Sequence, residues 1–166
     1  MRTIRFVIIA ALTAFTACSH ASSGAKATGE PSSAAASADA PSQQTTQWGP
    51  APAVFPPGAE FAVLQGDPSK AEPFTVRLRF PNGYKIPPHT HPTAENVTVL
   101  SGTFLAGMGA RFVESDLHPY GRDDFASVPA GHAHFAMARG QTIVQVTAIG
   151  PFALTYVNPD GSAIAR

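Results

Sequence analysis

The sequence contains little cysteine and little charge, and both shortages limit what the protein can be. Its 166 residues include a single cysteine, so no disulfide can form within one chain. Charged residues make up only 13%, with 11 basic and 11 acidic side chains, which gives a formal net charge of zero. A neutral chain lacks the basic surface that binds phosphate backbones, so we expect no nucleic-acid partner.

Long apolar runs are also scarce. The apolar run at residues 6–17 follows a basic start at Arg2 and Arg5. It is shorter than the roughly 20 residues that a membrane-spanning helix needs. This arrangement is typical of a secretory signal, so we expect residues 1–17 to be a cleaved signal peptide. The two arginines are not adjacent, so twin-arginine export of an already folded chain is not expected.

The single cysteine, Cys18, directly follows Phe15-Thr16-Ala17 at the end of this run. The segment resembles a bacterial lipoprotein box, although leucine is usual where Phe15 stands. The resemblance implies that Cys18 is lipidated and that this anchor is the chain's sole membrane contact. The alternative is ordinary signal cleavage near Ala17 or Ala21. Either route predicts an exported protein, which is periplasmic or anchored to the outer membrane as a lipoprotein.

The segment after the cysteine differs in composition from the rest of the chain. Residues 18–47 are mostly small or polar and contain hardly any large apolar side chain. Such a segment cannot bury enough surface to offset its ordering entropy, so we expect a flexible tether, lipid-anchored or secreted. The domain is expected at residues 48–159, followed by a tail at 160–166.

Within the expected domain, short apolar segments alternate with Gly and Pro turns, and no 3.6-residue period is convincing. The clearest case is residues 74–80, where Phe74, Val76, Leu78 and Phe80 fall on one face of an extended chain. Asn82-Gly83 then predicts a turn, and Ser101-Gly102 predicts a hairpin between its flanking strands. These signals indicate an all-β fold, a small antiparallel barrel or sandwich. The further strands are expected at 96–100, 103–106, 125–128, 135–138, 142–149 and 152–157.

Two histidines and a glutamate lie close together in the most informative segment. His89 and His91 are two residues apart, so in an extended chain their side chains point to the same side. Glu95 is four residues further on, and a bend at Pro92 can return its carboxylate to the same point. Two imidazoles and one carboxylate form much of a metal shell. A lone His-X-His is equally compatible with a surface loop.

The surrounding pattern resembles the cupin family. Gly83 before the histidine pair, Glu95 after it and Gly102 beyond it resemble the first cupin motif. The segment ending Pro129-Ala-Gly131-His-Ala-His134 resembles the second motif. Two positions depart from the family pattern: Asp123 stands at the usual opening glycine, and Ala138 replaces a frequent asparagine.

The resemblance implies a jelly-roll barrel (a double-stranded β-helix) that binds one divalent metal ion. The implied ligands are His89, His91, Glu95 and His134. The implied metal is one of Fe, Mn, Ni, Cu and Zn, and the sequence does not distinguish them. His132 is expected to be a turn residue, because the Pro129–Gly131 turn disturbs the alternation.

Other residues near the motifs have less certain roles. Phe104, Met108 and Phe135 are candidates for the pocket wall, with core packing as the alternative. Gln145 shares a strand face with Thr147, and a buried polar residue there could orient a ligand histidine. His118 is expected to be an ordinary loop residue.

A metal-binding cupin of the cell envelope is the function that these features predict. The resembled family includes dioxygenases, isomerases and lyases, and an oxidoreductase of dioxygenase type acting on a small organic molecule is the interpretation that we favour. No acid or base stands out beyond the ligands, so catalytic residues are not assigned. A non-catalytic module that binds metal or a small ligand is the alternative, because one fold hosts many functions. A homodimer remains open.

Lipidation at Cys18 can be tested directly on protein extracted from membranes. Mass spectrometry should show a diacyl- or triacyl-modified N-terminal cysteine, because Cys18 stands directly after the apolar run. A soluble periplasmic protein that begins at another residue would contradict the lipoprotein interpretation.

Overall fold

The structure, a computed structural model, describes residues 45–165. The expected signal peptide, Cys18 and nearly all of the expected tether lie outside the described residues, so these predictions stay predictions. In the part that the structure describes, no helix is long and apolar enough to cross a membrane.

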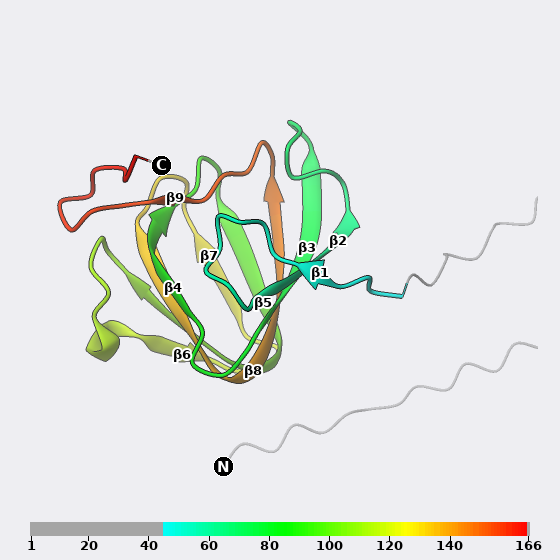
Figure 1. Ribbon diagram of the computed structural model, residues 1–166, viewed down its shortest axis with the longest axis horizontal. Coiled ribbons are helices and arrows are strands. Elements are labelled where there is room, and N and C mark those ends of the chain that lie inside the picture. The colour runs from blue at the N-terminus through cyan, green and yellow to red at the C-terminus, as the bar shows by residue number, and fades with distance from the viewer. Residues whose placement is uncertain (1–44, 166) are drawn as a thin grey trace, which may run out of the picture. The chain divides into compact units, whose positions relative to one another are not determined.

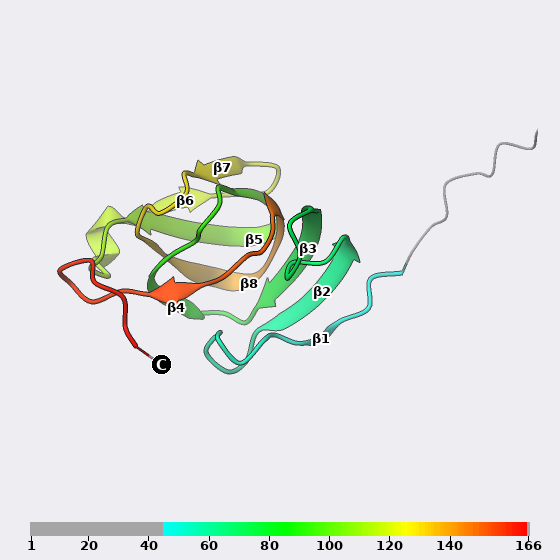
Figure 2. The same ribbon diagram turned by 90° about the horizontal axis from the view of Figure 1, so that it is seen from above.

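Antiparallel strands make up almost all of the regular structure in residues 45–165 (Figure 1). Nine strands join into one sheet, and the single helical element of this part is the short 3-10 helix η1. The sheet curls rather than lying flat, which gives the half-barrel seen from above in Figure 2. The predicted all-β antiparallel fold of the jelly-roll type is confirmed. The elements are β1 (Gly49–Pro50), β2 (Glu60–Gln65), β3 (Pro73–Phe80), β4 (Lys85–Thr90), β5 (Glu95–Met108), η1 (Glu114–Asp116), β6 (His118–Tyr120), β7 (Phe125–Val128), β8 (His134–Ile149) and β9 (Thr155–Tyr156).

β8 occupies the centre of the sheet. Its first half pairs with β4 on one side and with the end of β5 on the other, and its second half lies between β3 and the start of β5. β8 therefore pairs with three other strands, β3, β4 and β5. The predicted alternation in β3 is confirmed, because Phe74, Val76, Leu78 and Phe80 are all buried in the core.

The hairpin predicted at Ser101-Gly102 is wrong. Residues 95–108 form one continuous strand, β5, and both of its halves pair with β8. The register shifts around Ser101, and Gly102 has a φ of 75°. A positive-φ glycine suits a bulge as well as a turn, and here the uninterrupted partner strand selects the bulge. For the same reason the strands predicted at 135–138 and 142–149 are one strand, β8, in which Gly140 has a φ of 73°.

The strand predicted at residues 152–157 is mostly absent. Only Thr155–Tyr156 is extended and paired, as β9. The chain leaves β8 after Ile149, and the Phe152 amide donates to the carbonyl of Pro68 at 2.8 Å. This bond turns residues 150–154 towards the loop between β2 and β3 instead of along a strand. Phe152 and Leu154 consequently face the interior of the barrel.

Replacing Gly102 with alanine tests the bulge. A methyl group there would lie 2.4 Å from the Gln141 carbonyl oxygen in a left-handed backbone conformation. Such a conformation alone costs about 1–2 kcal/mol, and the overlap adds to it. Gly102→Ala should therefore lower the free energy of unfolding by more than Gly140→Ala, whose φ is 73° but whose added methyl meets no atom within 4 Å. Equal losses in chemical denaturation would show that the close packing at Gly102 is unimportant.

Candidate metal centre

Strand register brings the predicted ligands together from three parts of the chain. His89 is in β4 and His91 follows that strand directly, while Glu95 begins β5. His134 begins β8 and lies opposite His89 of β4 in the pairing. The bend expected at Pro92 is present and turns the chain between His91 and Glu95.

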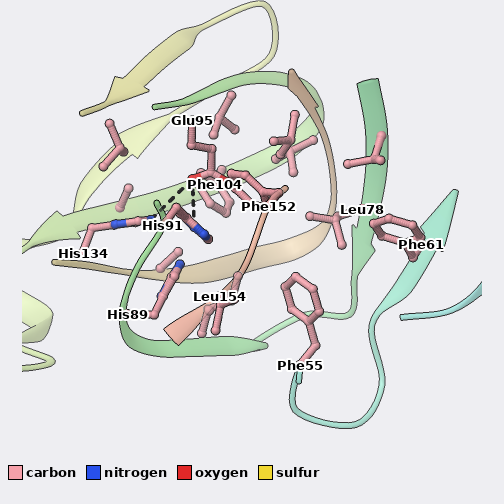
Figure 3. Close-up of a pocket in the computed structure, with 18 of the residues that line it drawn as sticks. Phe55, Phe61, Leu78, His89, His91, Glu95, Phe104, His134, Phe152 and Leu154 are labelled. Atoms are coloured by element: carbon pink, nitrogen blue, oxygen red, sulfur yellow. Dashed lines mark ion pairs between the residues drawn. The ribbon is translucent and has the colours of Figure 1, made fainter. Parts of the chain in front are cut away.

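The three histidines converge on one point. One ring nitrogen from each of His89, His91 and His134 lies within 4.8 Å of the others, and all three side chains are buried. Glu95 faces the same point, and its Oε2 lies 3.7 Å from Nε2 of His91 and 3.4 Å from Nε2 of His134 (Figure 3). The structure therefore gathers all four predicted ligand residues at one place.

Backbone carbonyls fix the orientation of each imidazole. Nδ1 of His89 donates to the carbonyl of Pro87 at 2.7 Å, and Nδ1 of His134 donates to that of His132 at 3.0 Å. Nδ1 of His91 donates to the carbonyl of Ala153 at 2.8 Å. A carbonyl can only accept, so each Nδ1 carries its proton, and a neutral ring held in this way presents Nε2 as a lone pair.

Two of these Nε2 atoms have no hydrogen-bond partner, although the Glu95 carboxylate lies close to both. Nε2 of His91 and Nε2 of His134 are buried and make no hydrogen bond with any described residue. Buried polar atoms are nearly always satisfied, and an orphaned one indicates a functional role or a bound group. The convergence of lone pairs on one point fits a metal ion, which the three buried histidines can hold.

The protonation states also suit a cation. Burial, assisted by the neighbouring His134 and His91 rings, lowers the pKa of His89 to about 3. Burial likewise lowers the pKa of His91. Burial alone would raise the pKa of Glu95, but the three histidines together hold it below its usual value. Near neutral pH the site thus combines neutral imidazoles at His89 and His91 with a carboxylate at Glu95.

A largely apolar cavity of about 130 Å³ opens beside the four residues. Its volume is close to the roughly 150 Å³ of an apolar cavity that holds benzene. The ionisable side chains in its wall are His89, His91, Glu95 and His134. The rest of the wall is apolar and comprises Pro52, Phe55, Phe61, Pro68, Phe74, Val76, Leu78, Phe80, Ile86, Val97, Phe104, Ala106, Ala126, Val128, Ala136, Val144, Val146, Phe152 and Leu154.

Of the residues proposed for the pocket wall, only Phe104 lies in it. Met108 lies at the end of β5 and is 54% exposed. Phe135 follows His134 and therefore points to the opposite face of β8, where its ring packs against Phe112. Gln145 is also on an outer face, and its Oε1 accepts a hydrogen bond from Nε of Arg77 at 3.3 Å. The structure thus places Met108, Phe135 and Gln145 outside the cavity, and the fully buried Phe135 fits the alternative of core packing.

The remaining histidines of the domain lie away from the cluster. His132 is an exposed turn residue, as expected, and its contribution to the site is its backbone carbonyl. His118 was expected in a loop but begins β6, where it is exposed and packs edge-on against Tyr120. Asp123 adopts a φ of 69°, so it takes the left-handed conformation that glycine would provide at this position.

Sequence reasoning missed the contribution of residues 152 and 153. The Phe152 ring stacks on the His91 imidazole, with centroids 4.3 Å apart and planes inclined by 21°. The next residue, Ala153, supplies the carbonyl that orients the same imidazole. No motif marks these residues, because their role comes from the path of the loop rather than from its side-chain chemistry.

Metal content of histidine variants tests the centre. His89→Ala and His134→Ala should lose most of their metal, because loss of a ligand costs more than the roughly 10- to 100-fold weakening caused by loss of an outer partner. His132→Ala and His118→Ala should keep it, because neither side chain lines the cavity. Plasma mass spectrometry on the four variants and the parent is the measurement. Full occupancy in His134→Ala together with loss in His132→Ala would reverse the assignment of the two histidines.

Comparison with known proteins agrees with this architecture. Residues 40–153 match the family model described as the ChrR cupin-like domain. No curated protein matches the chain.

Three solved structures illustrate the shared fold. An acetylacetone dioxygenase from Acinetobacter johnsonii has 17% identity and a TM-score of 0.56, covering 75% of this chain and 84% of its own. A protein from Methylibium petroleiphilum PM1, provisionally described as an acetylacetone dioxygenase, has 23% identity and a TM-score of 0.56. The match covers 72% of this chain and 81% of that protein. A protein of unknown function with a cupin-like fold from Ralstonia eutropha has 20% identity and a TM-score of 0.52, covering 66% and 64%.

At these identities the solved structures establish the fold alone. The family match is independent of them and spans more than half of the sequence. The chain therefore belongs to the ChrR cupin-like domain family.

Proposed function

We propose that this cupin is a metal-dependent oxidoreductase of dioxygenase type, acting on a small, mainly apolar organic molecule with an oxygen-bearing end. The observation that carries the proposal is the pairing of two features. Buried Nε2 lone pairs of His91 and His134 lack protein partners, and they lie in the wall of an apolar cavity. The first feature supports a metal, and the second supports an organic ligand beside it.

The proposed metal ligands are His89, His91 and His134, with Glu95 as the fourth. A bound divalent ion would supply Lewis acidity and, where it is redox-active, electrons for reaction with dioxygen. The protein's own part is to orient the three imidazoles through their Nδ1–carbonyl bonds, while burial keeps His89 and His91 neutral. The Glu95 carboxylate partly balances the charge of a cation at this point.

The cavity wall limits the substrate in polarity and in size. Apart from the proposed ligands, its residues are Ala, Ile, Leu, Phe, Pro and Val, so a substrate finds no other side-chain hydrogen-bonding group there. The oxygen-bearing end of the molecule would therefore turn towards the histidines and its apolar part towards the phenylalanines. Two of the structural neighbours are described as acetylacetone dioxygenases, one of them provisionally. Acetylacetone is a small molecule with oxygen atoms and apolar methyl groups, and it serves as a first probe.

We further propose that the activity lies outside the cytoplasm, with the cupin held at the cell envelope by a lipid on Cys18. The support is the order of segments in the sequence: a basic start, an apolar run, a cysteine and then a stretch of small and polar residues. A tether of that kind would let the domain meet small molecules away from the membrane surface.

Oxygen consumption tests the proposed reaction. Tag-free protein loaded separately with Fe, Mn, Ni, Cu or Zn is mixed with acetylacetone and with other small ketones. At least one redox-active metal should support oxygen uptake that depends on the organic compound. His134→Ala should fall to background, whereas His132→Ala, which removes an exposed ring, should retain the activity.

Two outcomes would count against the proposed reaction. Binding of an organic molecule to metal-loaded protein without oxygen uptake would favour the non-catalytic binding module. Failure of all five metals to bind a well-folded sample would remove the metal centre itself.

A further inference from the structure

Phe55 lines both the cavity and a second hollow on the surface. Its side chain lines the cavity beside the histidines, and it also lines an outer groove of about 410 Å³. It is the residue that the two hollows share among the described residues. Figure 3 shows the ring entering the pocket from the segment that precedes β2. A molecule that passed between the groove and the cavity would therefore meet this ring.

The backbone on both sides of Phe55 is held in place. The Val54 carbonyl accepts a hydrogen bond from the Tyr156 hydroxyl at 2.9 Å, and the Pro56 carbonyl accepts one from the Tyr84 hydroxyl at 2.5 Å. Both tyrosines are buried in the barrel, with exposed fractions of 5% and 8%. The Phe55 amide donates to the carbonyl of Pro52 at 2.9 Å. The position of the ring is thus set by the barrel, and side-chain rotation is the remaining way to move it.

The outer groove has the chemistry of an apolar vestibule. Its wall contains no charged side chain and is rich in proline, which loses little conformational entropy when a ligand packs on it. The prolines of this wall are Pro56, Pro57, Pro87 and Pro88. Pro87, which belongs to this wall, also carries the carbonyl that orients His89. The groove and the metal centre are therefore direct neighbours.

We propose that Phe55 is the residue that sets the size limit of ligands at the metal centre. With its ring in place, the cavity is confined to about 130 Å³, enough for a molecule the size of benzene. Without the ring, the cavity and the groove become one apolar space, and ligands with an additional aromatic or alkyl group fit. This inference rests on the proposed function only in one respect, the class of molecule that is expected to enter the cavity.

Binding of two metal ligands of different size tests the proposal without any turnover. Imidazole and 4-phenylimidazole are titrated into cobalt-loaded full-length protein, and the visible spectrum of the cobalt reports binding. Phe55→Ala should tighten 4-phenylimidazole by about tenfold or more relative to imidazole, because a steric block is removed. Phe55→Leu should give a smaller change in the same direction.

Phe125→Ala is the matched control, because Phe125 is 59% exposed and does not line the cavity. It should leave the ratio of the two affinities unchanged. A Phe55→Ala protein that keeps its cobalt and its fold but binds 4-phenylimidazole no better than the parent does would overturn the size limit. This result is independent of oxygen uptake, so the size limit can stand if the proposed reaction fails, and the reverse also holds.

Discussion

β8 hydrogen-bonds to β4 on one side of His134 and to β5 on the other, and the metal centre depends on this double pairing. It places His134 opposite His89 across one ladder and next to the end of β5 across the other. The same strand continues past Gly140 to pair with β3, so the register of the site and the register of the core are set together. A slip of one residue would turn His134 outward and Phe135 inward, which would remove the site and disrupt the packing at once.

The bonds that orient the candidate ligands come from the backbone. A side chain that orients a ligand can rotate, whereas the carbonyls of Pro87, His132 and Ala153 belong to the main chain. The cost of this arrangement is that buried nitrogen lone pairs are left without protein partners, each at about 1–3 kcal/mol. A cation offsets that cost in the folded state alone, so metal binding and stability are linked.

The convergence of the candidate ligands could be predicted in part from the sequence, because the spacing of His89, His91 and Glu95 reflects local geometry. His89 and His91 share a side of an extended chain, and the bend at Pro92 returns Glu95, both of which follow from a few neighbouring residues. Gly102 and Gly140 were harder, since a glycine with positive φ fits a hairpin turn and a bulge equally. The partner strand decides between them, and it lies far away in the sequence. Gln145 was misplaced for a related reason: Val144 and Val146 face the core, and the outer face can carry polar side chains paired with each other.

Phe55 and Phe152 could not be found from the sequence, because each owes its place to contacts made by its neighbours. Phe152 depends on its own amide bond to Pro68, and Phe55 depends on hydroxyl groups of Tyr84 and Tyr156 that bond the residues beside it. Tyr156 also pairs with His89 across β4 and β9, with ring centroids 6.2 Å apart. One tyrosine thus contacts both His89, a candidate metal ligand, and the segment that carries Phe55. Substitution of Tyr156 should therefore disturb both His89 and the segment that carries Phe55. Substitution of Phe55 removes a ring but leaves the backbone at both places unchanged. Loop side chains such as Phe55 can therefore vary while the candidate ligands, most of which lie on strands, stay in place. Variation of this kind lets one fold bind different small molecules.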